Sequence, residues 1–163
     1  MVKPLPNIKS YVLKLLGMAD RSESELRSRL QDKGYEAAAI DETIDQLKDI
    51  GIIDDRKTAE SILRYCKEQR LLGENGSKHY LKRRGIPDEI IAGIAISTDE
   101  QMEKAKKLIG KREKYLKNLP LKVKMNRLYN QLQRKGYGYE IINRAIREYE
   151  RSCEYEAQVL EKA

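Results

Sequence analysis

Apolar residues recur along this chain at steps of three and four, which is the spacing of one face of an α-helix. The pattern is clearest over residues 11–19, 59–66 and 102–116. The strict alternation of apolar and polar residues that marks a half-buried strand is almost absent. The sequence therefore predicts an all-α protein.

A short motif of the form Leu-x-x-basic-Gly-apolar occurs three times and indicates an internal repeat. Its glycines are Gly34, Gly85 and Gly136, and each is separated from the next by 51 residues. An apolar pair follows each glycine at the same distance, at residues 39–40, 90–91 and 141–142. Glycine reaches the left-handed backbone conformation with which many helices end. Each motif therefore predicts a helix that ends at glycine and a turn into the next helix.

Helix starts are indicated by capping residues. Ser22 with Glu25 has the spacing of a capping box, and Thr98 with Gln101 is interpreted as another cap. Residues 73–76 (Gly-Glu-Asn-Gly) are interpreted as an ordinary turn between helices, with a hinge as the alternative.

Each glycine motif is preceded by one further amphipathic segment, so we expect three helices per repeat. The predicted repeats are residues 1–55, 56–97 and 98–163, the last with a C-terminal tail. A repeat of this size buries little surface alone and must pack on its neighbours. We therefore expect three tandem three-helix repeats in an elongated, curved molecule.

The composition provides enough apolar residues for a core but contains neither Phe nor Trp. Hydrophobic residues make up 40% of the chain, but Phe and Trp are absent and all ten aromatic residues are Tyr. The core must therefore consist mainly of Leu and Ile. Tyr35 and Tyr137 occupy the repeat position of Ile86, so we expect these two tyrosines to be buried.

Several classes of protein are disfavoured. No segment approaches the roughly 18–20 apolar residues of a membrane span, and the first residues lack the apolar region of a secretory signal, so we expect a soluble, cytoplasmic protein without a membrane partner. Cys66 and Cys153 stand far apart without metal-ligand spacing, so we expect free thiols and no metal. The one histidine, His79, lies in a basic segment and is expected at the surface. We expect no enzyme activity and no cofactor.

The positive charge is concentrated toward the C-terminus. Residues 1–55 carry 8 basic and 11 acidic side chains, whereas residues 98–163 carry 16 and 10. Residues 106–127 alone hold nine basic side chains and one acid, Glu113. Such a concentration of one sign of charge favours an anionic partner for this part of the chain.

Five lysines at helical spacing predict a basic stripe on one helix. They are Lys104, Lys107, Lys111, Lys114 and Lys117. Like charges at this spacing cost about 0.2–0.5 kcal/mol per pair, which phosphates or acidic side chains would offset. A solvated lysine-rich face without a ligand is the alternative, and charge alone leaves both open. The candidate contact residues are Lys82, Arg83, Arg84, Lys107, Lys111, Lys114, Lys117, Lys122, Lys124, Arg134 and Lys135.

Four passages together resemble the RecX family of bacterial regulators of the RecA recombinase. They are residues 21–26 (Arg-Ser-Glu-Ser-Glu-Leu), 51–55 (Gly-Ile-Ile-Asp-Asp), 81–86 (Leu-Lys-Arg-Arg-Gly-Ile) and 134–137 (Arg-Lys-Gly-Tyr). Their order and repeat spacing carry the resemblance, which extends over residues 9–150. Residues 73–78 depart from the family's usual Gly-rich, Arg-containing turn.

The resemblance implies a non-enzymatic modulator that binds RecA and lies in the groove of the RecA filament on single-stranded DNA. Inhibition of ATP hydrolysis and strand exchange would follow. The candidate lysines and arginines would then face DNA phosphates or an acidic surface of RecA. Nothing in the sequence pattern requires a dimer, so we expect a monomer. Two other classes stay open: a helix-turn-helix DNA-binding regulator without RecA specificity, and a helical scaffold that binds only proteins.

Overall fold

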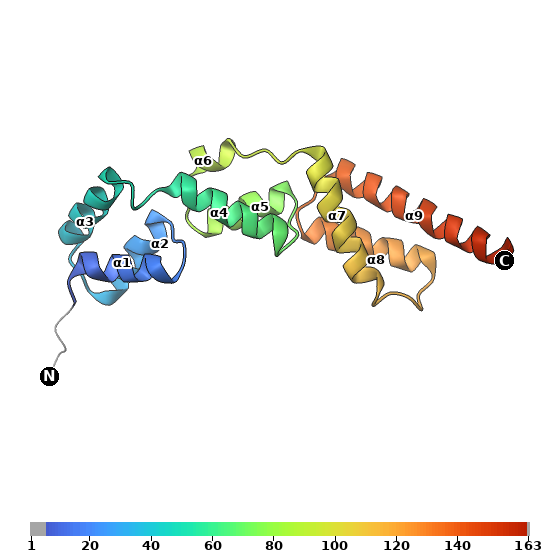
Figure 1. Ribbon diagram of the computed structural model, residues 1–163, viewed down its shortest axis with the longest axis horizontal. Helices are drawn as coiled ribbons and strands as arrows, with labels where there is room; N and C mark the ends of the chain where they lie inside the picture. Colours follow the sequence, from blue (N-terminus) through green and yellow to red (C-terminus); the bar gives the residue numbers. More distant parts are fainter. Residues whose placement is uncertain (1–5, 163) are drawn as a thin grey trace. The chain divides into compact units, whose positions relative to one another are not determined.

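The computed structural model describes residues 6–162, and this part of the chain consists of nine helices without a strand (Figure 1). The helices are α1 (Ile8–Met18), α2 (Glu23–Lys33), α3 (Ala37–Asp49), α4 (Asp55–Glu68), α5 (Glu74–Arg83), α6 (Asp88–Ala92), α7 (Thr98–Glu113), α8 (Leu121–Arg134) and α9 (Tyr139–Lys162). The prediction of an all-α fold is confirmed. None of the described helices combines the length and the apolar character that a membrane span needs.

The three repeat glycines end helices as predicted. Gly34, Gly85 and Gly136 have φ angles of 92°, 72° and 77°, in the left-handed region that side chains with a Cβ resist. Each follows the last turn of α2, α5 or α8. The 51-residue spacing therefore records three equivalent helix ends.

One predicted helix start is confirmed and another is wrong. Ser22 Oγ accepts a hydrogen bond from the Glu25 amide at 3.1 Å, and the Glu25 carboxylate accepts one from the Ser22 amide at 3.1 Å, which completes the capping box. The N-cap of α7 is Ser97 rather than Thr98. Ser97 has the extended ψ of 150° that a cap requires, whereas Thr98 already lies in the helix.

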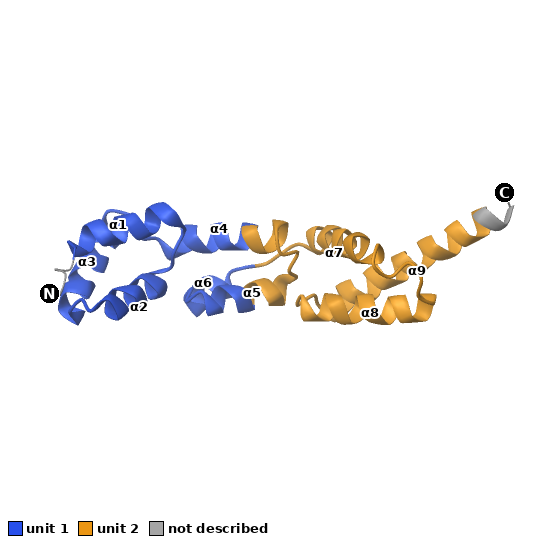
Figure 2. Ribbon diagram, turned by 90° about the horizontal axis from the view of Figure 1, so that it is seen from below, with its two compact units in different colours: residues 1–64, 79–94 blue, residues 65–78, 95–163 orange. Residues whose placement is uncertain are grey.

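The chain forms two compact units (Figure 2). Unit 1 comprises residues 1–64 and 79–94, and unit 2 comprises residues 65–78 and 95–163. Two of the three borders fall within α4 and α5, so each unit contains a part of these two helices, and the third lies between α6 and α7. The division into repeats at 1–55, 56–97 and 98–163 stays a prediction.

The core of unit 1 lies among α1, α2 and α3, which contact one another. It consists of Val12, Leu15, Leu26, Leu30, Ile40, Ile44, Leu47 and Ile53. Tyr35 packs against this core but is only half-buried, because its hydroxyl reaches outward and donates to the Pro6 carbonyl at 2.8 Å. The expectation for this tyrosine is thus met only in part.

The core of unit 2 lies among α7, α8 and α9. The predicted apolar face of α7 is buried in it, with Ala105, Leu108 and Ile109. Tyr137 is buried as predicted, and its hydroxyl donates to the Leu71 carbonyl at 3.2 Å. A buried hydroxyl with a partner avoids the cost of losing its hydrogen bond to water.

Candidate functional site

The predicted basic stripe does not lie on one helix. The helix α7 ends at Glu113, and the chain continues in tight turns, with Leu116 N donating to the Glu113 carbonyl at 2.8 Å and Leu119 N to the Leu116 carbonyl at 3.0 Å. These turns place Leu116 in the core of unit 2. Lys114 and Lys117 therefore lie outside the helix, which corrects the prediction.

Lys104, the first member of the predicted stripe, is buried rather than free. The residue is only 8% exposed, and its Nζ donates hydrogen bonds to Glu68 at 2.9 Å and to Glu103 at 3.4 Å. The hydrogen bond with Glu68 raises the pKa of Lys104. This lysine is an internal ion-pair partner and is not available to a ligand.

A basic hollow of about 400 Å³ in unit 2 gathers several candidate residues. Five basic residues and one tyrosine line it together with apolar neighbours: Arg70, Lys111, Arg112, Lys114, Tyr115 and Lys135. No acid is among the described residues that line it. We name it the Tyr115 hollow.

The charges of the Tyr115 hollow act on one another. Burial lowers the pKa of Lys135, and the positive charges of Arg70, Arg112 and Lys111 lower it further. Lys135 Nζ donates to the Arg70 carbonyl at 2.7 Å, which fixes the ammonium at the wall of the hollow. Burial and neighbouring positive charges both disfavour the charged form of a lysine, so the lowered pKa reflects how close these cations lie to one another.

A second basic hollow, of about 370 Å³, shares Arg112 with the first. Arg127 and Arg134 line it as well, with Asn130 and Gln131, and no acid is among the residues of this lining. We name it the Arg127 hollow. Arg134 and Lys135 are neighbours in sequence and line one hollow each. Because the two hollows share Arg112, we refer to their basic residues together as the basic surface of unit 2, which consists of Arg70, Lys111, Arg112, Lys114, Arg127, Arg134 and Lys135.

Four further candidates of unit 2 line neither hollow. They are Lys107, Lys117, Lys122 and Lys124. Conversely, Arg70, Arg112 and Arg127 line the hollows but were not among the predicted contact residues. Arg112 and Arg127 belong to the dense basic stretch, so charge density could have found them. Arg70 follows α4, far from that stretch in the sequence, and only the fold brings it to the Tyr115 hollow.

The remaining candidates, Lys82, Arg83 and Arg84, lie in unit 1. Lys82 is exposed and pairs with Asp88 at 3.1 Å. Arg84 is engaged in the interior of a polar network: its Nε donates to Glu25 Oε1 at 2.5 Å, and its Nη2 donates to the Asp20 carbonyl at 2.9 Å. The guanidinium group of Arg84 is therefore already engaged in hydrogen bonds within the protein.

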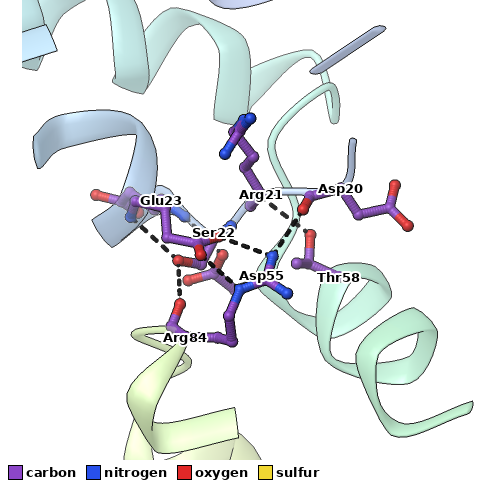
Figure 3. Close-up of polar contacts among 8 residues, drawn as sticks. Asp20, Arg21, Ser22, Glu23, Asp55, Thr58 and Arg84 are labelled. Carbon is purple, nitrogen blue, oxygen red and sulfur yellow. Dashed lines mark hydrogen bonds and ion pairs between the residues drawn. The ribbon is translucent and has the colours of Figure 1, made fainter. Parts of the chain in front are cut away.

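The network around Arg84 joins segments that are distant in sequence (Figure 3). Ser22 Oγ, the cap of α2, donates to the Arg84 carbonyl at 2.5 Å. The Glu23 amide donates to Asp55 Oδ1 at 2.9 Å. Burial raises the pKa of Asp55, whereas Glu25 has a lowered pKa because the Arg84 and Ser22 hydrogen bonds outweigh its burial. The network holds the start of α2 to the start of α4 and the end of α5.

Comparison with known proteins assigns the family. The model of the RecX first three-helix domain matches residues 9–47, and that of the RecX third three-helix domain matches residues 99–146. The regulatory protein RecX of Mycobacterium sp. (strain KMS) is 32% identical over 136 residues, which cover 78% of this chain and 73% of that protein. The chain belongs to the RecX family.

Two other RecX proteins show the extent of the likeness. The regulatory protein RecX of Bacillus velezensis is 36% identical over 86% of this chain, which spans only 55% of that relative's length. The crystal structure of RecX from Lactobacillus salivarius has a TM-score of 0.77 and 27% identity, and the match covers 86% of this chain and 93% of that one. The RecX fold is therefore shared over most of the described residues.

The passages that resemble RecX have different roles in the structure. Residues 21–26, 51–55 and 81–86 contribute Ser22, Glu25, Asp55 and Arg84 to the network of unit 1, so these RecX motifs have a structural role here. Residues 134–137 contribute Arg134 and Lys135 to the basic surface of unit 2.

Proposed function

We propose that this RecX-family chain binds RecA and the RecA filament on single-stranded DNA, and that it inhibits the ATPase, recombinase and strand-exchange activities of RecA. The observation that carries the proposal is the match to proteins named regulatory protein RecX. The chain acts by binding and is not an enzyme. Because RecA works on DNA inside the cell, the proposal includes a cytoplasmic location, and we expect a monomer.

The basic surface of unit 2 is the part of the chain that we assign to the filament. Arg112 is common to both of its hollows, and the lining residues of each include arginines or lysines without an acid. An RecA filament offers phosphates of its DNA and acidic side chains of its protein, and either would offset the repulsion among these cations. Arg84 is excluded from this assignment because Glu25 occupies its guanidinium.

The experiment is single-stranded-DNA-dependent ATP hydrolysis by the cognate RecA, measured with increasing amounts of this protein at two salt concentrations. We expect inhibition at substoichiometric amounts, because one bound molecule can block a filament that contains many RecA protomers. Higher salt should weaken the inhibition, since the contacts are ionic. If the folded protein leaves hydrolysis unchanged at every ratio, the proposal is wrong, and specific binding to duplex DNA becomes the next hypothesis to test.

A further inference from the structure

We propose that the Tyr115 hollow is a subsite for single-stranded nucleic acid, in which the cations hold a backbone phosphate and the ring of Tyr115 stacks on the adjacent unpaired base. This inference rests on the proposed function and adds to it the chemical class of the ligand and the residues that bind it.

In the described part of the chain, acids pair two basic side chains of α7 but none of the three that residues 111–114 contribute to the hollow. On α7, Lys104 pairs with Glu68 at 2.9 Å, and Lys106 pairs with Glu148 at 2.6 Å. Lys111, Arg112 and Lys114 make no ion pair with an acid in the described part of the chain. The end of α7 and the residue after it thus present three cations to the hollow without an acidic partner among the described residues.

An external anion is the natural partner of such a group. Burial disfavours the charged form of Lys135, and the charges of Arg70, Arg112 and Lys111 add to the effect on its pKa. A phosphate group would offset the repulsion among these cations, because it supplies negative charge and accepts hydrogen bonds from several donors at once. The hollow of about 400 Å³ lies within the range of roughly 300–1,000 Å³ that is typical of small-ligand sites.

Tyr115 distinguishes nucleic acid from other anions. The residue is 81% exposed, although its neighbour Leu116 is buried in the core. The Tyr115 amide donates to the Arg112 carbonyl at 3.0 Å, and Leu116 anchors the turn, so the backbone that carries the ring is held in place. Aromatic rings beside cations are the usual means of binding unpaired bases, whose faces are inaccessible within a duplex. An acidic peptide would use the cations but not the ring.

The Arg127 hollow extends the subsite along a strand. It shares Arg112 with the Tyr115 hollow, and Arg134 of this second hollow is next in sequence to Lys135 of the first. One strand that passes Arg112 would therefore meet cations of both hollows. A strand laid across both hollows would present successive phosphates to them.

The test uses the full chain without RecA and measures fluorescence anisotropy of a labelled oligothymidylate over a range of salt concentrations. Lys111→Ala/Lys114→Ala should weaken binding and reduce the salt slope by about 0.7 for each lost phosphate contact. Tyr115→Ala should weaken binding about tenfold without changing the slope, and Tyr115→Phe should restore most of the affinity. The matched control, Lys122→Ala/Lys124→Ala, removes the same charge from the same unit outside both hollows and should bind like the parent.

The inference is overturned if the hollow variants, folded by circular dichroism, bind the oligothymidylate no worse than the control. It is also overturned if poly-glutamate competes with the oligothymidylate equally in the parent and in Tyr115→Ala, because the hollow would then be a general anion or acidic-peptide site. RecA ATPase assays on the same proteins separate the two proposals. Inhibition of RecA without oligothymidylate binding refutes the subsite alone, whereas binding with the expected pattern but no inhibition refutes the proposed function alone.

Discussion

Gly136 and Gly76 pack backbone against backbone, so closely that a Cβ on Gly136 would lie 2.1 Å from the amide nitrogen of Gly76. The turn that carries Gly136 follows α8, and Gly76 lies in the first turn of α5. The Gly73 amide adds a hydrogen bond to the Lys135 carbonyl at 2.9 Å. The segment 73–76 is therefore a tightly packed helix start, and its glycines are required by this contact rather than by a hinge.

The same contact occurs in unit 1 with different chemistry. There the turn at Gly85 packs on the start of α2, and a Cβ on Gly85 would lie 2.5 Å from Ser24 Cβ. Ser22 Oγ donates to the Arg84 carbonyl, and Arg84 pairs with Glu25. Unit 1 thus uses side-chain hydrogen bonds and an ion pair where unit 2 uses glycine and backbone. The 51-residue repeat accounts for both, since Ser22 and Gly73 are related by that spacing.

We expect Gly76→Ala to lower the free energy of unfolding by about 1–3 kcal/mol, the range for overpacking a close contact. The new Cβ would lie 2.2 Å from the backbone oxygen of Lys135, which cannot move as a side chain can. Gly110→Ala is the control, because a Cβ at this position of α7 meets nothing within 4 Å. It should stabilise the protein by about 0.5–1 kcal/mol. Urea unfolding followed by circular dichroism measures both, and equal stability of Gly76→Ala and the parent would contradict the packing.

Arg84→Ala should lower the free energy of unfolding by about 1–3 kcal/mol, because it removes charge-assisted hydrogen bonds to Glu25 and leaves the half-buried carboxylate without its partner. Arg83→Ala, at the exposed neighbour, should change stability little. Neither substitution should alter binding to the oligothymidylate. A loss of binding in Arg84→Ala at unchanged stability would instead assign Arg84 to the partner surface.

The stability of unit 1 should decrease at acid pH in a way that depends on Glu25. Burial alone would raise its pKa, but the hydrogen bonds from Arg84 and Ser22 lower it below its ordinary value of 4.5. A carboxyl group with a lowered folded-state pKa contributes stability above its unfolded pKa and loses it as the pH falls through the folded pKa. Glu25→Gln keeps the cap but should flatten the fall in stability below about pH 4.5. The exposed Glu60→Gln should leave the profile of melting temperature against pH unchanged, and an unchanged profile for Glu25→Gln as well would refute the pairing.

The two thiols should react at different rates. Cys66 is fully buried, whereas Cys153 is half-buried on α9. A water-soluble thiol reagent should therefore label Cys153 first in the native protein, and Cys66 only on the timescale of local or global unfolding. Mass spectrometry after partial labelling identifies the site, and prior modification of Cys66 would contradict the packing of α4.

Local sequence signals determined much of the fold. The glycine at each repeat end was predictable because a left-handed φ is a property of a single residue, and the capping box at Ser22 was predictable because its partners lie within one turn. The length of α7 was not, since the turns after Glu113 form so that Leu116 can enter a core built by α8 and α9. Periodicity within one segment does not show where such a contact ends the helix.

The positive charge of the candidate site was predictable from the sequence, but the set of residues that form it was not. Lys111, Lys114 and Lys135 were expected and do line the Tyr115 hollow. Lys104 shares their helical spacing, yet Glu68 of α4 pairs with it and removes it from the surface. Arg70 lines the hollow from outside the basic stretch. Both differences arise from contacts between segments far apart in sequence, which spacing within one helix cannot reveal.

The most direct test of the account is inhibition of single-stranded-DNA-dependent ATP hydrolysis by the cognate RecA with three proteins: the parent, Lys111→Ala/Lys114→Ala and Lys122→Ala/Lys124→Ala. All three should fold alike, since the substituted lysines make no ion pair in the described part of the chain. We predict that the parent and the control inhibit at similar concentrations and that the hollow variant needs at least about tenfold more protein. Equal inhibition by all three would contradict the assignment of the basic surface to the filament.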